Sequence, residues 1–167
     1  MGNNTKAEVI TIGMGDDIGI CPFLEGEQRS WCEVIYPMSE FPYPCTISSI
    51  SYYNAGIYGM MWPWPSMATS LNIYMGERES LSHSSRNDWT PLSDLTLVYS
   101  QENVVLGAEC EWNEFVLDEP FTYEHDGNLV IVIAKTNPSP DWDFNFWVIQ
   151  SSNVNSTLYK TSSRRCF

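Results

Sequence analysis

Two tryptophans stand two positions apart in YGMMWPWPSM, residues 58–67, and a proline follows each of them. Proline lacks a backbone N–H and fixes φ, so this segment cannot be a helix interior or a paired central strand. A residue before proline is held extended, and Trp62 and Trp64 are therefore expected about 6–7 Å apart on one side of a stiff loop. Two indole faces in that arrangement can stack on sugar rings, and Tyr58 would widen the apolar surface.

A second aromatic segment, SPDWDFN at residues 139–145, places Trp142 between Asp141 and Asp143. We expect these two carboxylates and Asn145 to bind the hydroxyls of a sugar that stacks on Trp142. Carboxylates two positions apart on an extended chain also approach the separation of about 5–9 Å that glycoside hydrolysis uses. The same spacing recurs elsewhere in the chain, so it gives little support for catalysis, and we expect no enzyme.

Other motifs point to neither catalysis nor an organic cofactor. Neither His83 nor His125 stands in an HExxH or GxSxG motif, and both are predicted to lie at the surface or in a turn. GMGDDIG, residues 13–19, lacks the Lys-Ser/Thr of a phosphate loop, and its carboxylates would repel phosphate. Asp16 and Asp17 could instead help to bind a structural calcium ion, which takes carboxylate and carbonyl oxygens.

The cysteines leave the redox compartment open. There are five, Cys21, Cys32, Cys45, Cys110 and Cys166. None forms a CxxC pair, and their spacing fits no common zinc pattern. Export would allow one or two disulfides, whereas unpaired, buried cysteines would behave as small apolar residues.

The composition predicts one globular domain that binds a neutral ligand. Of the 167 residues, 43% are hydrophobic and only 17% are charged. Aromatic residues make up 14%, more than a core of this size needs, so some of them should face outwards. The net charge of −13 repels phosphate backbones and anionic membranes, so neither nucleic acid nor a membrane is an expected partner. A neutral polysaccharide meets no such repulsion.

Apolar and β-branched runs predict short strands along the whole chain. They lie at residues 46–54, 70–76, 95–100, 111–118, 129–135 and 144–150. LVIVIAK, residues 129–135, is apolar almost throughout, so it should lie in the middle of a sheet, and the Asp-Gly pair just before it predicts a tight turn. Residues 76–89 are the expected place for a short helix or an irregular excursion. The pattern predicts an all-β protein, an antiparallel β-sandwich with a jelly-roll-like arrangement.

Several stretches carry a family resemblance, most specifically IYMG, DWTPLSDLTLVYS and LDEPFTY with GNLVIVI. From Ile10 to Tyr159 the chain resembles a module that recurs in secreted, multidomain surface proteins and polysaccharide hydrolases of Bacteroidetes. The resemblance implies a β-sandwich, covalent linkage to other domains, and a secreted or cell-surface location. It also assigns Trp31, Trp89 and Trp112 to core or hairpin packing.

The departure from that family pattern lies between residues 54 and 70. Related modules pass between the two flanking strands through a short polar turn, whereas here the connection is longer and contains both Trp-Pro pairs. An insertion between two strands belongs at the rim of a sandwich rather than in its core.

These patterns predict a carbohydrate-binding module. Residues 1–9 resemble the engineered start of a domain cut from a longer chain, and residues 10–167 should form one binding module. We expect it to be non-catalytic and to target an attached glycoside hydrolase to β-glucan or cellulose, glucomannan or xylan. The alternative is an adhesin or a spacer domain of a secreted surface protein or peptidase, in which the same loop contacts protein.

Overall fold

The protein is an antiparallel β-sandwich in this computed structural model, which describes residues 8–12, 18–19, 29–54, 66–106, 111–136, 147–148 and 157–161. The strands are β1 (Ile18–Gly19), β2 (Arg29–Tyr36), β3 (Cys45–Asn54), β4 (Ser66–Arg78), β5 (Leu95–Leu106), β6 (Glu111–Tyr123), β7 (Asn128–Thr136), β8 (Trp147–Val148) and β9 (Thr157–Thr161). Short 3-10 turns lie at Met38–Glu40 and Leu92–Asp94, and these described ranges contain no α-helix. The predicted all-β class is therefore confirmed.

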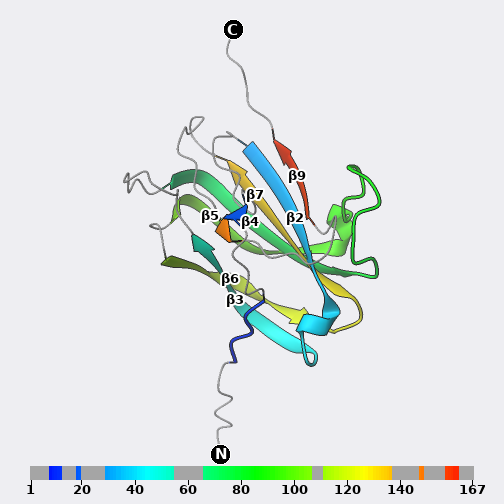
Figure 1. Ribbon diagram of the computed structural model, residues 1–167. Coiled ribbons are helices and arrows are strands. Elements are labelled where there is room, and N and C mark those ends of the chain that lie inside the picture. The colour runs from blue at the N-terminus through cyan, green and yellow to red at the C-terminus, as the bar shows by residue number, and fades with distance from the viewer. Residues whose placement is uncertain are drawn as a thin grey trace, which may run out of the picture.

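Two sheets form the two layers (Figure 1). One sheet has the order β5-β4-β7-β2-β9, and the other has the order β1-β8-β3-β6. Apolar side chains from both sheets meet between them and form the main core, which includes Ile73 and Ile133 of the first sheet and Phe115 of the second. These pairings establish the sandwich, while the jelly-roll arrangement stays a prediction.

Strand β7 occupies the centre of the five-stranded sheet, as its continuous apolar sequence predicts. Leu129, Ile131 and Ile133 face the main core. Val130 and Val132 face the opposite side, where Leu81 of the segment between β4 and β5 packs against their cluster. The strand is therefore buried on both faces, and this prediction is confirmed.

A β-bulge explains the mixed pattern of β3. Strict alternation would place Ile47 and Ile50 on opposite faces. The pairing with β6 shifts register between Ile47 and Ser49, and both isoleucines then pack against the main core together with Tyr52. Ser49, Ser51 and Tyr53 are left on the outer face of the sheet.

Strand β2 lies outside the ranges that alternation predicted. Both of its faces are largely buried, so its sequence, RSWCEVIY, shows no alternation of apolar and polar residues. Cys32 faces inwards and Glu33 faces outwards, and both side chains have no exposed surface. Neither Cys32 nor Cys45 forms a disulfide, and burial raises the pKa of the Cys45 thiol, with a smaller contribution from Glu8.

Side-chain hydrogen bonds stabilise the connections at one end of the sandwich, which we call the far end. The predicted turn between β6 and β7 occurs there, and Glu77 accepts the backbone N–H groups of Glu124, Asp126 and Gly127 at 2.8, 2.8 and 3.0 Å. His125, at a left-handed φ of 67°, lies within hydrogen-bond distance of two carbonyl oxygens of the segment between β2 and β3. The turn prediction is confirmed.

Candidate functional site

The residues predicted to bind sugar lie outside the described residues. They are Tyr58, Trp62, Trp64, Asp141, Trp142, Asp143 and Asn145. The same holds for the calcium candidates Asp16 and Asp17. The strands that flank both aromatic segments are described, however, and they show where each segment starts and ends.

Both aromatic segments start and end at the same end of the sandwich. The first follows Asn54 of β3, and the second leads into Trp147 of β8. Asn54 and Trp147 are direct antiparallel partners. Thr136, the last residue of β7, is paired with Ser70 near the start of β4. The two segments are therefore attached to neighbouring strand ends.

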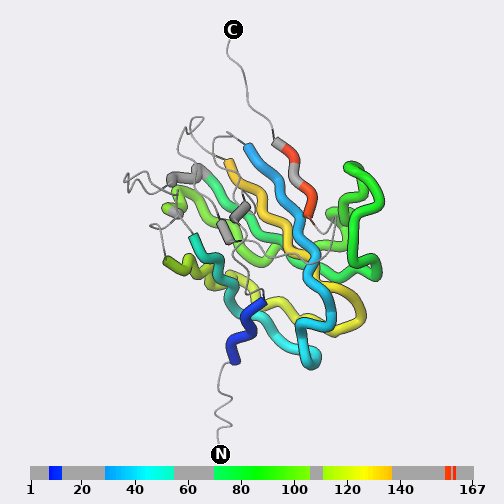
Figure 2. The backbone as a smooth tube through the Cα atoms, viewed as in Figure 1, coloured from blue at the N-terminus to red at the C-terminus, as the bar shows by residue number. Residues whose placement is uncertain are grey.

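We call this end the rim. Asn54 is also paired with Glu111 at the start of β6, and Ser66 is paired with Leu106 at the end of β5. Figure 2 shows the end of β3 and the start of β6 on the same side of the molecule, opposite the green segment that follows β4. The rim thus collects strand ends from both sheets.

An aromatic pair, of which one ring is exposed and the other half-buried, lies at the rim on the outer face of the four-stranded sheet. Tyr53 and Trp112 are cross-strand partners, their ring centroids are 5.5 Å apart, and their planes make an angle of 63°. Trp112 nevertheless keeps 61% of its surface exposed. The prediction of core or hairpin packing for Trp112 is wrong, because its ring is exposed and its partner strand β3 is not its neighbour in the chain.

The sequence contained a signal for this exposure. In EWNEFVLD, Phe115 and Leu117 are buried, so their alternation assigns Trp112 and Glu114 to the opposite, outer face. A tryptophan that alternates in the same phase as a glutamate indicates a surface position.

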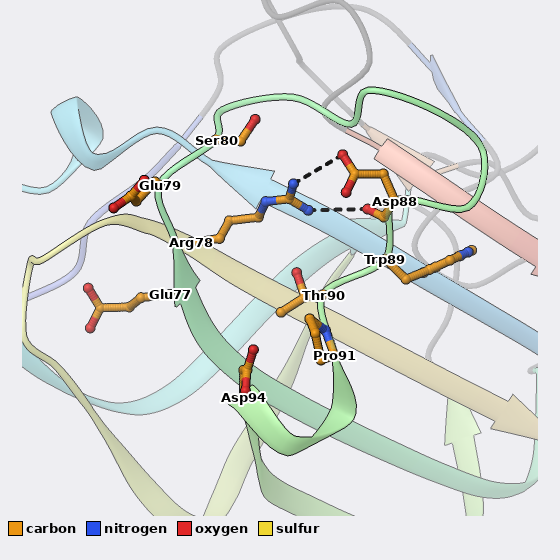
Figure 3. Close-up of a pocket in the computed structure, with 9 residues that line it drawn as sticks. All are labelled: Glu77, Arg78, Glu79, Ser80, Asp88, Trp89, Thr90, Pro91 and Asp94. Atoms are coloured by element: carbon orange, nitrogen blue, oxygen red, sulfur yellow. Dashed lines mark hydrogen bonds and ion pairs between the residues drawn. The ribbon is translucent and has the colours of Figure 1, made fainter.

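A hollow at the far end has a volume of about 350 Å³. It is lined by Glu77, Arg78, Glu79, Ser80, Asp88, Trp89, Thr90, Pro91 and Asp94. Figure 3 shows Arg78 directed towards Asp88, with Trp89 pointing away from the guanidinium. Residues 79–94 form an irregular segment on the outer face of the five-stranded sheet, which confirms the predicted irregular excursion from residue 79 onward, whereas residues 76–78 belong to β4.

Glu33 forms the base of this region and is fully buried. Its carboxylate accepts the backbone N–H of Thr90 at 3.1 Å and the Thr90 hydroxyl at 2.7 Å. Arg78 donates to it at 3.4 Å. These bonds join β2, the end of β4 and the segment before β5, so Glu33 holds that segment on the sheet.

Asp88 and His83 complete this network, which we call the Glu33 clamp. Hydrogen bonds from the Ser84 backbone and hydroxyl, aided by the nearby Arg78, hold the pKa of Asp88 below its usual value. His83 is only 4% exposed, and its Nδ1 donates to the Asp88 carbonyl at 2.8 Å. The prediction of a surface histidine at position 83 is therefore wrong, because the ring fills the space beneath the segment.

The clamp has the properties of a structural element. Its carboxylates are engaged by Thr90, Ser84 and Arg78, and Glu77 is occupied by the turn between β6 and β7. Among the described residues, no group of three or more His, Cys, Asp or Glu could hold a metal ion. The rim, with its exposed indole, is the better candidate for ligand binding.

Comparison with protein-family models, with curated proteins and with solved structures found no match to this chain. In the part of the chain that the structure describes, no helix is long and apolar enough to cross a membrane. The function therefore has to be inferred from the chain's own residues.

Proposed function

We propose that this chain is a non-catalytic carbohydrate-binding module with a jelly-roll-like sandwich. It targets an attached glycoside hydrolase to a neutral plant polysaccharide: β-glucan or cellulose, glucomannan or xylan. Its binding residues are those of the two aromatic segments: Tyr58, Trp62, Trp64, Asp141, Trp142, Asp143 and Asn145. Its secreted or cell-surface location follows from the family resemblance.

The pairing of Asn54 with Trp147 is the observation that carries this proposal. It attaches the end of the second aromatic segment beside the start of the first. Three tryptophans that are distant in sequence can thereby serve one ligand. The partly exposed Tyr53–Trp112 pair at the same rim adds aromatic surface that the core does not use.

Charge narrows the class of ligand. The chain carries −13, and Glu111 and Glu114 are exposed beside the rim, so a polyanion would be repelled. Neutral sugars offer C–H faces that pack on indole rings and hydroxyls that donate to carboxylates. Prolines after Trp62 and Trp64 reduce the conformational entropy that binding would cost.

Native affinity electrophoresis tests the proposal, with hydroxyethylcellulose, β-glucan, glucomannan or xylan in the gel. We expect at least one polysaccharide to retard the protein, and Trp62→Ala/Trp64→Ala to lose that retardation while its melting temperature is kept. Leu92→Ala is the matched control, because it removes an apolar side chain, 57% exposed, at the far end. A protein that no polysaccharide retards would contradict the proposal and favour an adhesin or spacer, whereas release of reducing ends would indicate an enzyme.

A further inference from the structure

We infer that the outer face of the four-stranded sheet carries a second sugar-binding surface, which continues from the rim along β3 and β6. We call it the sheet strip. It consists of three cross-strand pairs: Tyr53–Trp112, Ser51–Glu114 and Ser49–Val116. The ligand is a single extended chain of a neutral polysaccharide, so this inference rests on the proposed function.

Alternation places all six side chains of the strip on one face. Ile50 and Phe115, which are partners between the second and third pairs, point into the core. Trp112 is 61% exposed and Val116 is 64% exposed, and Ser51 and Glu114 are exposed as well. Successive pairs lie about 7 Å apart, because two residues of a strand span that length. The strip is therefore longer than one sugar ring.

The chemistry of the strip alternates along its length. Trp112 offers exposed apolar ring surface at the rim, and Tyr53 packs against it in a T-shaped arrangement. In the second pair, the Ser51 hydroxyl can donate to and accept from sugar hydroxyls, and the Glu114 carboxylate can accept from them. Val116 provides a further apolar surface beyond them. A polysaccharide chain presents the same succession of C–H patches and hydroxyls.

The Glu114 carboxylate favours a neutral polysaccharide on the strip over a second copy of the chain or an anionic polymer. A second copy of the chain packed face to face about a two-fold axis through the strip would bring two Glu114 carboxylates together. Such like charges would repel each other once water is removed. An anionic polymer would meet the same carboxylate and the net charge of −13. A neutral sugar chain leaves Glu114 partly hydrated and gives it hydroxyl donors.

The strip predicts how the module selects its ligand. A chain that reaches from the rim onto the sheet contacts both the aromatic segments and Trp112. Affinity should therefore rise with the length of the oligosaccharide until the strip is filled. The preferred ligand is a soluble, single chain rather than one sugar at a chain end.

Isothermal titration calorimetry tests this inference. The ligands are oligosaccharides of increasing length, prepared from the polysaccharide that retards the wild type. We expect Trp112→Ala to lower affinity for the longer oligosaccharides about tenfold, as removal of a central aromatic contact commonly does. The shortest ligand that still binds should be affected less. Glu114→Ala should weaken binding without loss of the aromatic surface, and Leu92→Ala should bind like wild type.

The possible results distinguish failure of the sheet strip from failure of the proposed function. If wild type binds and both Trp112→Ala and Glu114→Ala bind equally well at every length, the strip is refuted and the rim proposal stands. If wild type binds no polysaccharide, both proposals fail. If Trp112→Ala loses thermal stability, Glu114→Ala decides alone, because its side chain is exposed and its replacement should leave the fold unchanged.

Discussion

Replacing Glu33 tests whether the clamp stabilises the sandwich. In Glu33→Ala the Thr90 N–H and the guanidinium of Arg78, whose side chain is only 14% exposed, both lose their buried acceptor. Breaking a buried ion pair by removing one partner costs about 3–5 kcal/mol. For a chain of this size each kcal/mol lowers the melting temperature by about 2–4 °C, so a decrease of about 6–20 °C is expected.

A graded series makes this measurement more specific. Glu33→Gln keeps the shape and one acceptor oxygen but removes the charge, so it should cost about 1.5–3 kcal/mol, the range for a hydrogen bond to a charged group. Glu102→Gln is the control, because this glutamate of β5 is exposed, and it should stay within about 0.5 kcal/mol of wild type. Urea unfolding followed by circular dichroism gives all three free energies of unfolding.

Limited trypsin digestion locates the effect. Residues 79–94 contain the exposed Arg86, and release of this segment in Glu33→Ala should accelerate cleavage after that residue. If Glu33→Ala costs less than about 1 kcal/mol and cleavage is unchanged, the clamp does not hold the segment, and the reasoning is refuted.

Two further predictions concern the far end. Glu77→Ala should cost about 1–3 kcal/mol and accelerate hydrogen exchange at the Asp126 and Gly127 amides, because both donate to Glu77; unchanged exchange would contradict this. Burial raises the pKa of Tyr123 from 10.0 to about 12, with a smaller contribution from Glu77. Because the folded state holds this proton more tightly than the unfolded state, Tyr123 stabilises the fold below pH 10 and loses that contribution as pH rises through about 12. Tyrosinate absorbance should accordingly show a late titration that Tyr123→Phe removes.

Much of the fold could be predicted from local pattern. The strands with a regular face, such as residues 111–118, and the continuous apolar run of β7 were located correctly. Alternation of apolar and polar residues did not predict which residues of β3 face the core, because the register of this strand shifts. The register shift between β3 and β6 reverses the faces at Ser49, and such a shift depends on the partner strand, which the local sequence does not specify.

The clamp was missed for a related reason. Trp31, Glu33 and Ile35 share one face of β2, so a carboxylate stands between two apolar residues. This arrangement signals a buried, paired charge, but its partners, Arg78 and Thr90, come from distant positions in the chain. Only the three-dimensional fold brings them together.

The distribution of polar contacts explains why the rim suits ligand binding. At the far end Glu33, Glu77 and His125 fix the connections with side-chain hydrogen bonds, so this end supplies rigidity. At the rim an aromatic side chain, Trp112, remains exposed although burial would stabilise the fold by about 1.5–3 kcal/mol, as for other large apolar side chains. A ligand can cover the exposed part of this side chain, and burial of that part contributes a fraction of this free energy to binding. The sugar-binding proposals place the ligand where this unused hydrophobic surface lies.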